Sequence, residues 1–143
     1  MINIMHKQII GIFTNFKKTM TGGLYFSGYV GEGEYKEWHS NNQLFKHCFF
    51  KDGSMIDKCE TWFDNGQLYQ QFFLKKGMKD GEYKEWVDGG TLYKYCFYKD
   101  NKKNGEYKVW HENGQPEIHC FYKDNKKYTI EDAKQKFPEG PWL

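Results

Sequence analysis

The hexapeptide "GEYKEW" occupies residues 33–38 and recurs unchanged at 81–86, and a near copy, "GEYKVW", occupies 105–110. The copies begin 48 and then 24 residues apart, so a missing copy is expected at residue 57, where the sequence reads "DKCETW". Four of the five tryptophans follow this period of 24: Trp38, Trp62, Trp86 and Trp110. Self-similarity at a fixed interval of this length predicts a repeat protein in which each copy is one supersecondary unit.

Each repeat carries a turn signal shortly after its tryptophan. The clearest is Asn65-Gly66, because Asn-Gly favours a two-residue hairpin loop in which both residues have positive φ. The equivalent dipeptides are Asn41-Asn42, Gly89-Gly90 and Asn113-Gly114. We therefore predict that each repeat is a β-hairpin with a two-residue loop.

This register can be tested within the sequence, since directly opposed residues of a hairpin share a face and contact each other. It pairs an aromatic residue with a cysteine in every repeat: Tyr35–Cys48, Cys59–Phe72, Tyr83–Cys96 and Tyr107–Cys120. A second rung holds ion pairs, a polar pair and an apolar pair: Glu37–Lys46, Thr61–Gln70, Glu85–Lys94 and Val109–Ile118. Because the members of each rung change together between copies, the pattern supports hairpins in this register.

The same register predicts the two faces of the sheet. One face carries a rung at the tryptophans (Trp38–Phe45, Trp62–Tyr69, Trp86–Tyr93, Trp110–Glu117) and the row Phe49, Phe73, Phe97 and Phe121. The other carries the Tyr/Cys rungs with Leu44, Leu68 and Leu92. Between repeats, a second turn places Gly53, Gly77, Asn101 or Asn125 in one position. Gly or Asn there suggests a positive φ, but the register of this second turn stays open.

The predicted fold is all-β: a single domain over residues 1–143, built as an antiparallel meander of stacked hairpins in an open, curved sheet. Its repeats occupy 33–56, 57–80, 81–104 and 105–128. Residues 1–32 are expected to form an N-terminal cap, in which 9–32 thread as a decayed copy with Leu24, Tyr25 and Phe26 in pattern positions.

Residues 129–143 break the period and are expected to form a C-terminal cap. Thr129 followed by Asp132 resembles a capping box, and Ala133 and Phe137 fall on one helical face. We expect a short helix at 130–137 that lies over the end of the sheet and protects an edge strand from pairing with another chain.

Composition excludes several classes of protein. The chain has 143 residues with 21 basic and 19 acidic side chains, a net charge of +2, which is not the basic footprint of a nucleic-acid-binding protein. Aromatic residues make up 20% of the sequence, far too many for a disordered chain. The apolar stretches are too short to span a membrane, and the N-terminus lacks the features of a signal peptide. We therefore expect a cytoplasmic protein whose four cysteines are free thiols.

The stretches "CETWFDNGQLYQQFFLKKGMKD" (59–80) and "GEYKEWVDGGTLYKYCFYKDNKKN" (81–104) resemble units of the MORN-repeat variant family. The resemblance covers residues 33–128, with departures at Pro116 in the Leu position, at Asn101 and Asn125 in the last Gly position, and at the cysteines. It implies a curved sheet of stacked hairpins. It implies no particular activity, since such repeats serve as scaffolds, as membrane-apposed modules and, in bacteria, as presumed antitoxins.

Neither metal binding nor catalysis is predicted. In His47-Cys48 and in His119-Cys120, neighbouring side chains on a strand point to opposite faces and cannot hold one ion. Cys96 lies two strands from Cys120, about 10 Å away. Only Cys48 and Cys59 could approach each other, through the undetermined turn. No catalytic spacing stands out, so we expect a protein without enzymatic activity, metal or cofactor.

The remaining function is an interaction surface. We expect a scaffold or interaction module that binds another protein through the tryptophan rung, because large aromatic residues carry much of the energy of interfaces. The candidate residues are Trp38, Phe45, Trp62, Tyr69, Trp86, Tyr93 and Trp110. Two alternatives stay open: a stoichiometric, antitoxin-like inhibitor of a partner toxin, and a peripheral membrane module. The second is disfavoured because acidic residues match the lysines.

Overall fold

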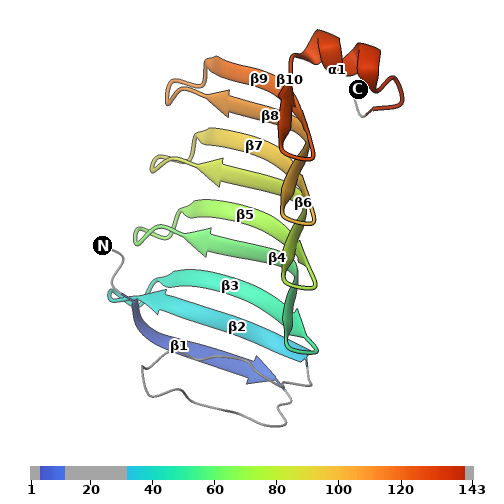
Figure 1. The fold of residues 1–143 in the computed structure, drawn as a ribbon. Coiled ribbons are helices and arrows are strands. Elements are labelled where there is room, and N and C mark those ends of the chain that lie inside the picture. Colours follow the sequence, from blue (N-terminus) through green and yellow to red (C-terminus); the bar gives the residue numbers. More distant parts are fainter. Residues whose placement is uncertain (1–3, 12–31, 141–143) are drawn as a thin grey trace.

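The structure, a computed structural model, describes residues 4–11 and 32–140. These residues form one antiparallel sheet in which ten strands follow each other in chain order, with one helix at the C-terminal end (Figure 1). The elements are β1 (Ile4–Gly11), β2 (Glu32–His39), β3 (Leu44–Lys51), β4 (Ser54–Trp62), β5 (Leu68–Lys75), β6 (Met78–Trp86), β7 (Leu92–Lys99), β8 (Lys102–Trp110), β9 (Pro116–Lys123), β10 (Lys126–Tyr128) and α1 (Ile130–Lys136). The predicted meander of stacked hairpins is confirmed.

The loops next to the tryptophans contain three residues, so the prediction of two was wrong. In the second repeat, the Phe63 N–H donates to the Gln67 carbonyl at 2.8 Å and the Gly66 N–H donates to the Phe63 carbonyl at 3.0 Å. Gly66 has a φ of 82°. This geometry is a type I turn followed by a left-handed residue, which requires positive φ only at the third loop position. Matching hydrogen bonds join His39 to Gln43, Val87 to Thr91 and His111 to Gln115.

A one-residue bulge follows each of these loops. Thr61 faces Gln70 but Trp62 faces Leu68, which leaves Tyr69 without a directly opposed residue. Each tryptophan therefore faces the Leu position: Trp38–Leu44, Trp62–Leu68, Trp86–Leu92 and Trp110–Pro116. The predicted rung of tryptophans against Phe45, Tyr69, Tyr93 and Glu117 is wrong. Leu44, Leu68 and Leu92 share the tryptophans' face and not, as predicted, the Tyr/Cys face.

Beyond the bulge, the rest of each hairpin has the predicted register, because the longer loop and the bulge offset each other. The confirmed pairs are Tyr35–Cys48, Cys59–Phe72, Tyr83–Cys96, Tyr107–Cys120, Glu37–Lys46, Thr61–Gln70, Glu85–Lys94 and Val109–Ile118. Between repeats, Phe72 faces Tyr83 and Cys96 faces Tyr107. The separate rungs are thus joined into rows that cross the sheet.

The turns between repeats are the ones with two-residue loops. Lys51 faces Ser54, and the loop residues Asp52 and Gly53 have φ values of 49° and 76°. Positive φ at both positions defines a type I′ turn. The equivalent loops are Lys76-Gly77, Asp100-Asn101 and Asp124-Asn125, all with positive φ. The positive φ predicted at the Gly/Asn position is confirmed.

In the third and fourth repeats, the glycine of the hexapeptide lies where the strand bends. Phe72 faces Tyr83 and Leu74 faces Lys79, so β6 has three residues between these pairs where β5 has one. Gly81 lies in this bulge with a φ of 122°, and Gly105 lies in the same place in β8 with a φ of 142°. Figure 1 shows β4, β6 and β8 turning close to the two-residue loops that precede them. Glycine recurs because L side chains rarely adopt such φ values.

Hydrogen bonds from the two-residue loops join successive repeats. The N–H of Gly77 donates to the Met55 carbonyl at 2.8 Å, and that of Asn101 donates to the Lys79 carbonyl at 2.9 Å. The Asn101 Oδ1 also accepts from the Lys79 N–H at 2.7 Å, and Asn125 repeats both bonds with Lys103. Asparagine in this position therefore adds a second bond between repeats that glycine cannot make.

The C-terminal helix is confirmed close to its predicted bounds. The Thr129 Oγ1 accepts from the Asp132 N–H at 3.1 Å, which caps the N-terminus of α1. Ala133 is fully buried, and the Phe137 ring lies 6.0 Å from that of Phe121 and 5.5 Å from that of Tyr128. Thr129 stands 24 residues after the bend glycine Gly105. The chain thus leaves the sheet at the position where the other repeats bend.

At the opposite end of the sheet, β1 pairs antiparallel with β2, on the side of β2 away from β3. Ile4 faces His39 at one end of this pairing, and Gly11 faces Gly33 at the other. The decayed repeat predicted for residues 9–32 concerns mainly 12–31. These residues, with Leu24, Tyr25 and Phe26, lie outside the described part of the chain.

Candidate interaction surface

A row that combines one aromatic residue and one cysteine from each hairpin crosses one face of the sheet. Its members are Tyr35, Cys48, Cys59, Phe72, Tyr83, Cys96, Tyr107 and Cys120. The four cysteines are buried, and Tyr35 and Tyr83 are 6% and 5% exposed. Each ring faces a small sulfur-bearing side chain within its hairpin, which explains the aromatic–cysteine pairs that the sequence shows.

This face is the inside of the bend, and we call it the inner face. Lys79 and Tyr83 are four residues apart, about 13 Å along a straight strand. The Lys79 Nζ nevertheless lies 4.7 Å from the centroid of the Tyr83 ring. The long lysine side chain reaches back across Gly81, where the strand bends toward this face.

The expectation of four free thiols is wrong for two of the cysteines. Cys48 and Cys59 form a disulfide between β3 and β4, with Cα atoms 4.3 Å apart. The undetermined turn explains the error, because the bulge that follows it places Cys59 beside Cys48 in the same row. Cys96 and Cys120 are free and buried, and burial raises the pKa of both thiols.

Ammonium groups alternate with tyrosine rings on the inner face of the last repeats. The Lys94 Nζ lies 5.3 Å from the Tyr83 centroid and 5.8 Å from the Tyr107 centroid. The Lys103 Nζ lies 4.9 Å from the centroids of both Tyr107 and Tyr122. We call this arrangement the lysine–tyrosine ladder: Lys79, Tyr83, Lys94, Tyr98, Lys103, Tyr107 and Tyr122. Cation–π contacts of this kind contribute about 0.5–2 kcal/mol each, most where water is excluded.

The ladder concentrates positive charge. In the part of the chain that the structure describes, no carboxylate lies within the 4.0 Å ion-pair distance of the ammonium groups of Lys79, Lys94 and Lys103. Burial lowers the pKa of Lys79, and the nearby charge of Lys94 acts in the same direction. Glu85, whose charge acts on Lys79, accepts a 2.7 Å hydrogen bond from the Tyr83 hydroxyl. Burial and this hydrogen bond raise the pKa of Tyr83.

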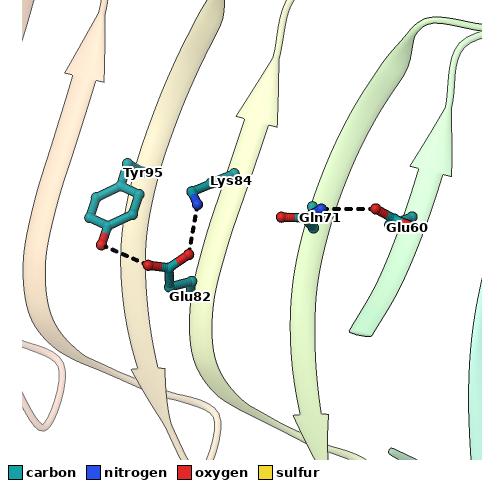
Figure 2. A network of polar contacts seen from close by, with 5 residues as sticks. All are labelled: Glu60, Gln71, Glu82, Lys84 and Tyr95. Atoms are coloured by element: carbon teal, nitrogen blue, oxygen red, sulfur yellow. Dashed lines mark hydrogen bonds and ion pairs between the residues drawn. The ribbon is translucent and has the colours of Figure 1, made fainter. Parts of the chain in front are cut away.

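The outer face, in contrast, carries neutralised charges. The Glu82 carboxylate accepts from the Lys84 Nζ at 2.6 Å and from the Tyr95 hydroxyl at 3.4 Å (Figure 2). Figure 2 also shows the Gln71 amide donating to Glu60 at 2.8 Å. The equivalent groups are Glu34 with Lys36 and His47, Glu106 with Lys108 and His119, and Lys58 with Glu60. Lys58 and Glu60 exchange the positions of acid and base, which keeps the pair.

The seven predicted contact residues do not share a face. The Tyr69 ring lies 4.8 Å from that of Phe63. Burial, and next the charge of Glu85, raise the pKa of Tyr69. Because Glu85 contacts Tyr83 of the inner row, Tyr69 lies on the inner face as well. By their equivalent bulge positions Phe45 and Tyr93 lie there too, with Phe45 5.0 Å from the His39 ring. Alternation along the strands places Trp38, Trp62, Trp86 and Trp110 on the outer face, where they are half-buried.

The structure also places the side chains considered as metal ligands. The His47 Nε2 lies 3.6 Å from a Glu34 oxygen on the outer face, while Cys48 lies in the inner row. Within residues 4–11 and 32–140, no three His, Cys, Asp or Glu side chains are grouped so that they could hold a metal ion. Over the same residues, no helix is long and apolar enough to cross a membrane.

Sequence reasoning missed the lysine–tyrosine ladder. Lys94 was paired with Glu85 alone, and Lys79 and Lys103 belonged to turns whose register was undetermined. A signal was nevertheless present, because both lysines stand two residues before a bend glycine, Gly81 or Gly105.

The fold and its faces define a repeat protein whose surfaces carry rows of equivalent side chains, one set from each hairpin. Two segments, residues 31–52 and 103–124, match the family model described as MORN repeat variant, and they begin three repeat periods apart. Both segments are therefore identified as MORN repeats, a kind of repeat that often mediates protein or membrane interaction. Searches of curated proteins and of solved structures returned no match.

Proposed function

We propose that the protein is a non-enzymatic interaction module that binds an acidic segment of another protein on its inner face. The observation that carries the proposal is the lysine–tyrosine ladder, in which Lys79, Lys94 and Lys103 have no ion-pair partner among the described residues. An Asp- or Glu-bearing segment would supply the missing counter-charges. The tyrosine rings would supply contact area at a small cost in side-chain entropy.

The arrangement of polar groups supports a binding role over catalysis. An active site brings several polar groups with different roles to one place. Here equivalent groups recur one repeat apart, and each is engaged: Glu82 and Glu106 hold lysines, while Glu37 and Glu85 accept tyrosine hydroxyls. These contacts order the sheet and leave the inner ammonium groups as the charged groups available to a partner.

A peptide selection tests this proposal. Random peptides displayed on phage would be selected on the wild-type protein and on an inner-face variant, Lys79→Glu with Lys94→Glu and Lys103→Glu. A matched control carries the same change of charge at exposed strand ends beside the turns, Lys75→Glu, Lys102→Glu and Lys123→Glu. We expect Asp- and Glu-rich peptides to be enriched by the wild type and the control and lost with the inner-face variant. Equal enrichment by all three proteins would refute the proposal.

The aromatic contribution has its own test. Tyr93 is 37% exposed, and Tyr69, two strands away on the same face, is half-buried. Replacing both with Ser should weaken binding of a selected acidic peptide by more than it lowers stability. If affinity is unchanged while the melting temperature falls, these rings serve packing alone.

The proposal covers two kinds of partner, and stoichiometry separates them. A scaffold leaves its partner active, whereas an antitoxin-like inhibitor abolishes the partner's activity when the two are mixed in equal amounts. Flotation with phosphatidylserine vesicles tests the membrane alternative. Flotation that the inner-face variant abolishes would assign the ladder to lipid headgroups instead of an acidic protein.

A further inference from the structure

The last long strand of the sheet is paired on its far side over only part of its length. β10 pairs Lys126–Tyr128 with Phe121–Lys123, whereas Pro116 to Cys120 are paired with β8 alone among the described residues. The corresponding central residues of β3, β5 and β7 are paired on both sides. Figure 1 shows α1 beyond β10 and no strand beside this part of β9.

A hollow of about 900 Å³ lies along this edge, lined by Glu117–Cys120, by Lys126–Tyr128 and by residues 129–132. It exists because Thr129 occupies the bend position, so the chain enters α1 and does not build the second limb of another strand. The hollow therefore corresponds to the place of one missing strand.

We propose that this edge binds a short extended segment of another protein, which pairs antiparallel with Ile118–Cys120 and continues the sheet. Strand addition of this kind takes its affinity from main-chain hydrogen bonds and its specificity from the side-chain positions along the edge. The proposal concerns a surface distinct from the lysine–tyrosine ladder and does not depend on it.

The junctions inside the sheet indicate the chemistry of the segment. β9 reads "HCF" at 119–121, as β3 does at 47–49, and His47 lies between Glu34 in β2 and Glu60 in β4. His119 has the first of these partners, Glu106 at 2.8 Å, and lies at the open edge on the other side. A glutamate is therefore expected opposite His119.

The two neighbouring positions follow in the same way. A tyrosine is expected opposite Cys120, because Tyr107 faces Cys96 at the β7–β8 junction. A β-branched residue is expected opposite Ile118, which faces Val109 on its other side. The preferred segment thus reads Tyr-Glu-Val from N- to C-terminus. It is short because Pro116 has no N–H and closes the edge.

The test uses a fluorescein-labelled peptide, acetyl-GEYEVW-amide, titrated into the full-length protein and followed by anisotropy. The control peptide is N-methylated at both Tyr and Glu, since only alternate residues of a strand face one partner. We expect saturable binding that N-methylation weakens at least tenfold. Hydrogen exchange at the amides of Ile118–Cys120 should slow at least tenfold where their N–H groups face the peptide.

A reciprocal charge exchange keeps the test independent of stability. The wild type should prefer GEYEVW over GEYKVW, and the variant His119→Glu should reverse that preference. Equal binding of the N-methylated peptide, protection confined to the inner face, or no saturable binding would overturn the proposal. Concentration-dependent self-association of the protein alone, protecting the same amides, would also overturn it by identifying a second copy as the occupant.

Discussion

The bend glycine of the fourth repeat offers a test of the fold that can be worked out in atomic detail. A Cβ atom added to Gly105 would lie 2.8 Å from the Phe97 Cβ, and Gly105 has a φ of 142°. The neighbouring atom is attached directly to the backbone of β7, so a side-chain rotation cannot relieve the contact. Gly105→Ala must therefore shift one strand against the other at the bend.

Two terms contribute to the expected loss of stability. Holding alanine at this φ costs about 1–3 kcal/mol, and the forced shift costs about 1–3 kcal/mol, as overpacking of a core does. We expect a decrease of about 4 kcal/mol in the free energy of unfolding, from the middle of these ranges. At roughly 3–5 °C per kcal/mol for a chain of this size, the melting temperature should fall by about 10–20 °C.

The matched control is Gly77→Ala in a two-residue turn. Gly77 also has a positive φ, 76°, but no atom lies within 4 Å of its added Cβ. This variant should lose only the conformational term, about 1–2 kcal/mol. Urea unfolding followed by circular dichroism measures both variants. If they lose the same stability, positive φ alone selects glycine at Gly105, and the close approach of β7 and β8 does not.

Three further predictions concern the inner row and Tyr95 of the outer face. Tyr83→Ala and Cys96→Tyr should each destabilise, whereas Tyr83→Cys combined with Cys96→Phe, the combination that the second repeat uses, should cost less than the sum of the single changes; an additive double-mutant cycle would contradict this. Reduction of the Cys48–Cys59 disulfide, which joins cysteines 11 residues apart, should lower stability by up to about 3 kcal/mol, and a melting temperature insensitive to reductant would count against the bond. Burial and the Glu82 charge raise the pKa of Tyr95 to about 12, above its unfolded value, so stability should fall as pH rises from about 10 to 12; urea unfolding should show a smaller fall for Tyr95→Phe.

The pairs of directly opposed residues within each hairpin could be predicted from the sequence, because the two members of a pair change together from one repeat to the next. Tyr83 with Cys96 and Cys59 with Phe72 exchange large and small members, and the structure pairs them as expected. Covariation reports which residues touch, and it is insensitive to how the loop closes the hairpin.

The tryptophan rung could not be predicted, because a three-residue loop plus a bulge leaves the rest of the ladder in the register of a two-residue loop. The residues between the bulge and the loop reveal the difference: Trp62, for example, faces Leu68 in place of Tyr69. The candidate residues of the interaction surface were divided between two faces for this reason.

The lysine–tyrosine ladder depends on the bend, and the glycines that mark the bend in the sequence do not show toward which face it turns. Lys79 reaches Tyr83 and Tyr98 only after β6 turns at Gly81. The same bend brings Cys59 beside Cys48 in the second repeat, where Asp57 replaces glycine with a φ of 58°. Both features required the three-dimensional register of the turns between repeats.

Paramagnetic broadening of methyl signals tests the central claim, binding of an acidic segment to the inner face, most directly. A spin-labelled acidic peptide from the selection would be added to protein labelled at its Val and Leu methyl groups. Val109 lies in an inner-face row beside Lys94, whereas Leu92 faces Trp86 on the outer side. We predict strong broadening of the Val109 methyls and little of the Leu92 methyls. Broadening of Leu92 with Val109 unaffected would place the partner on the tryptophan face and contradict the account.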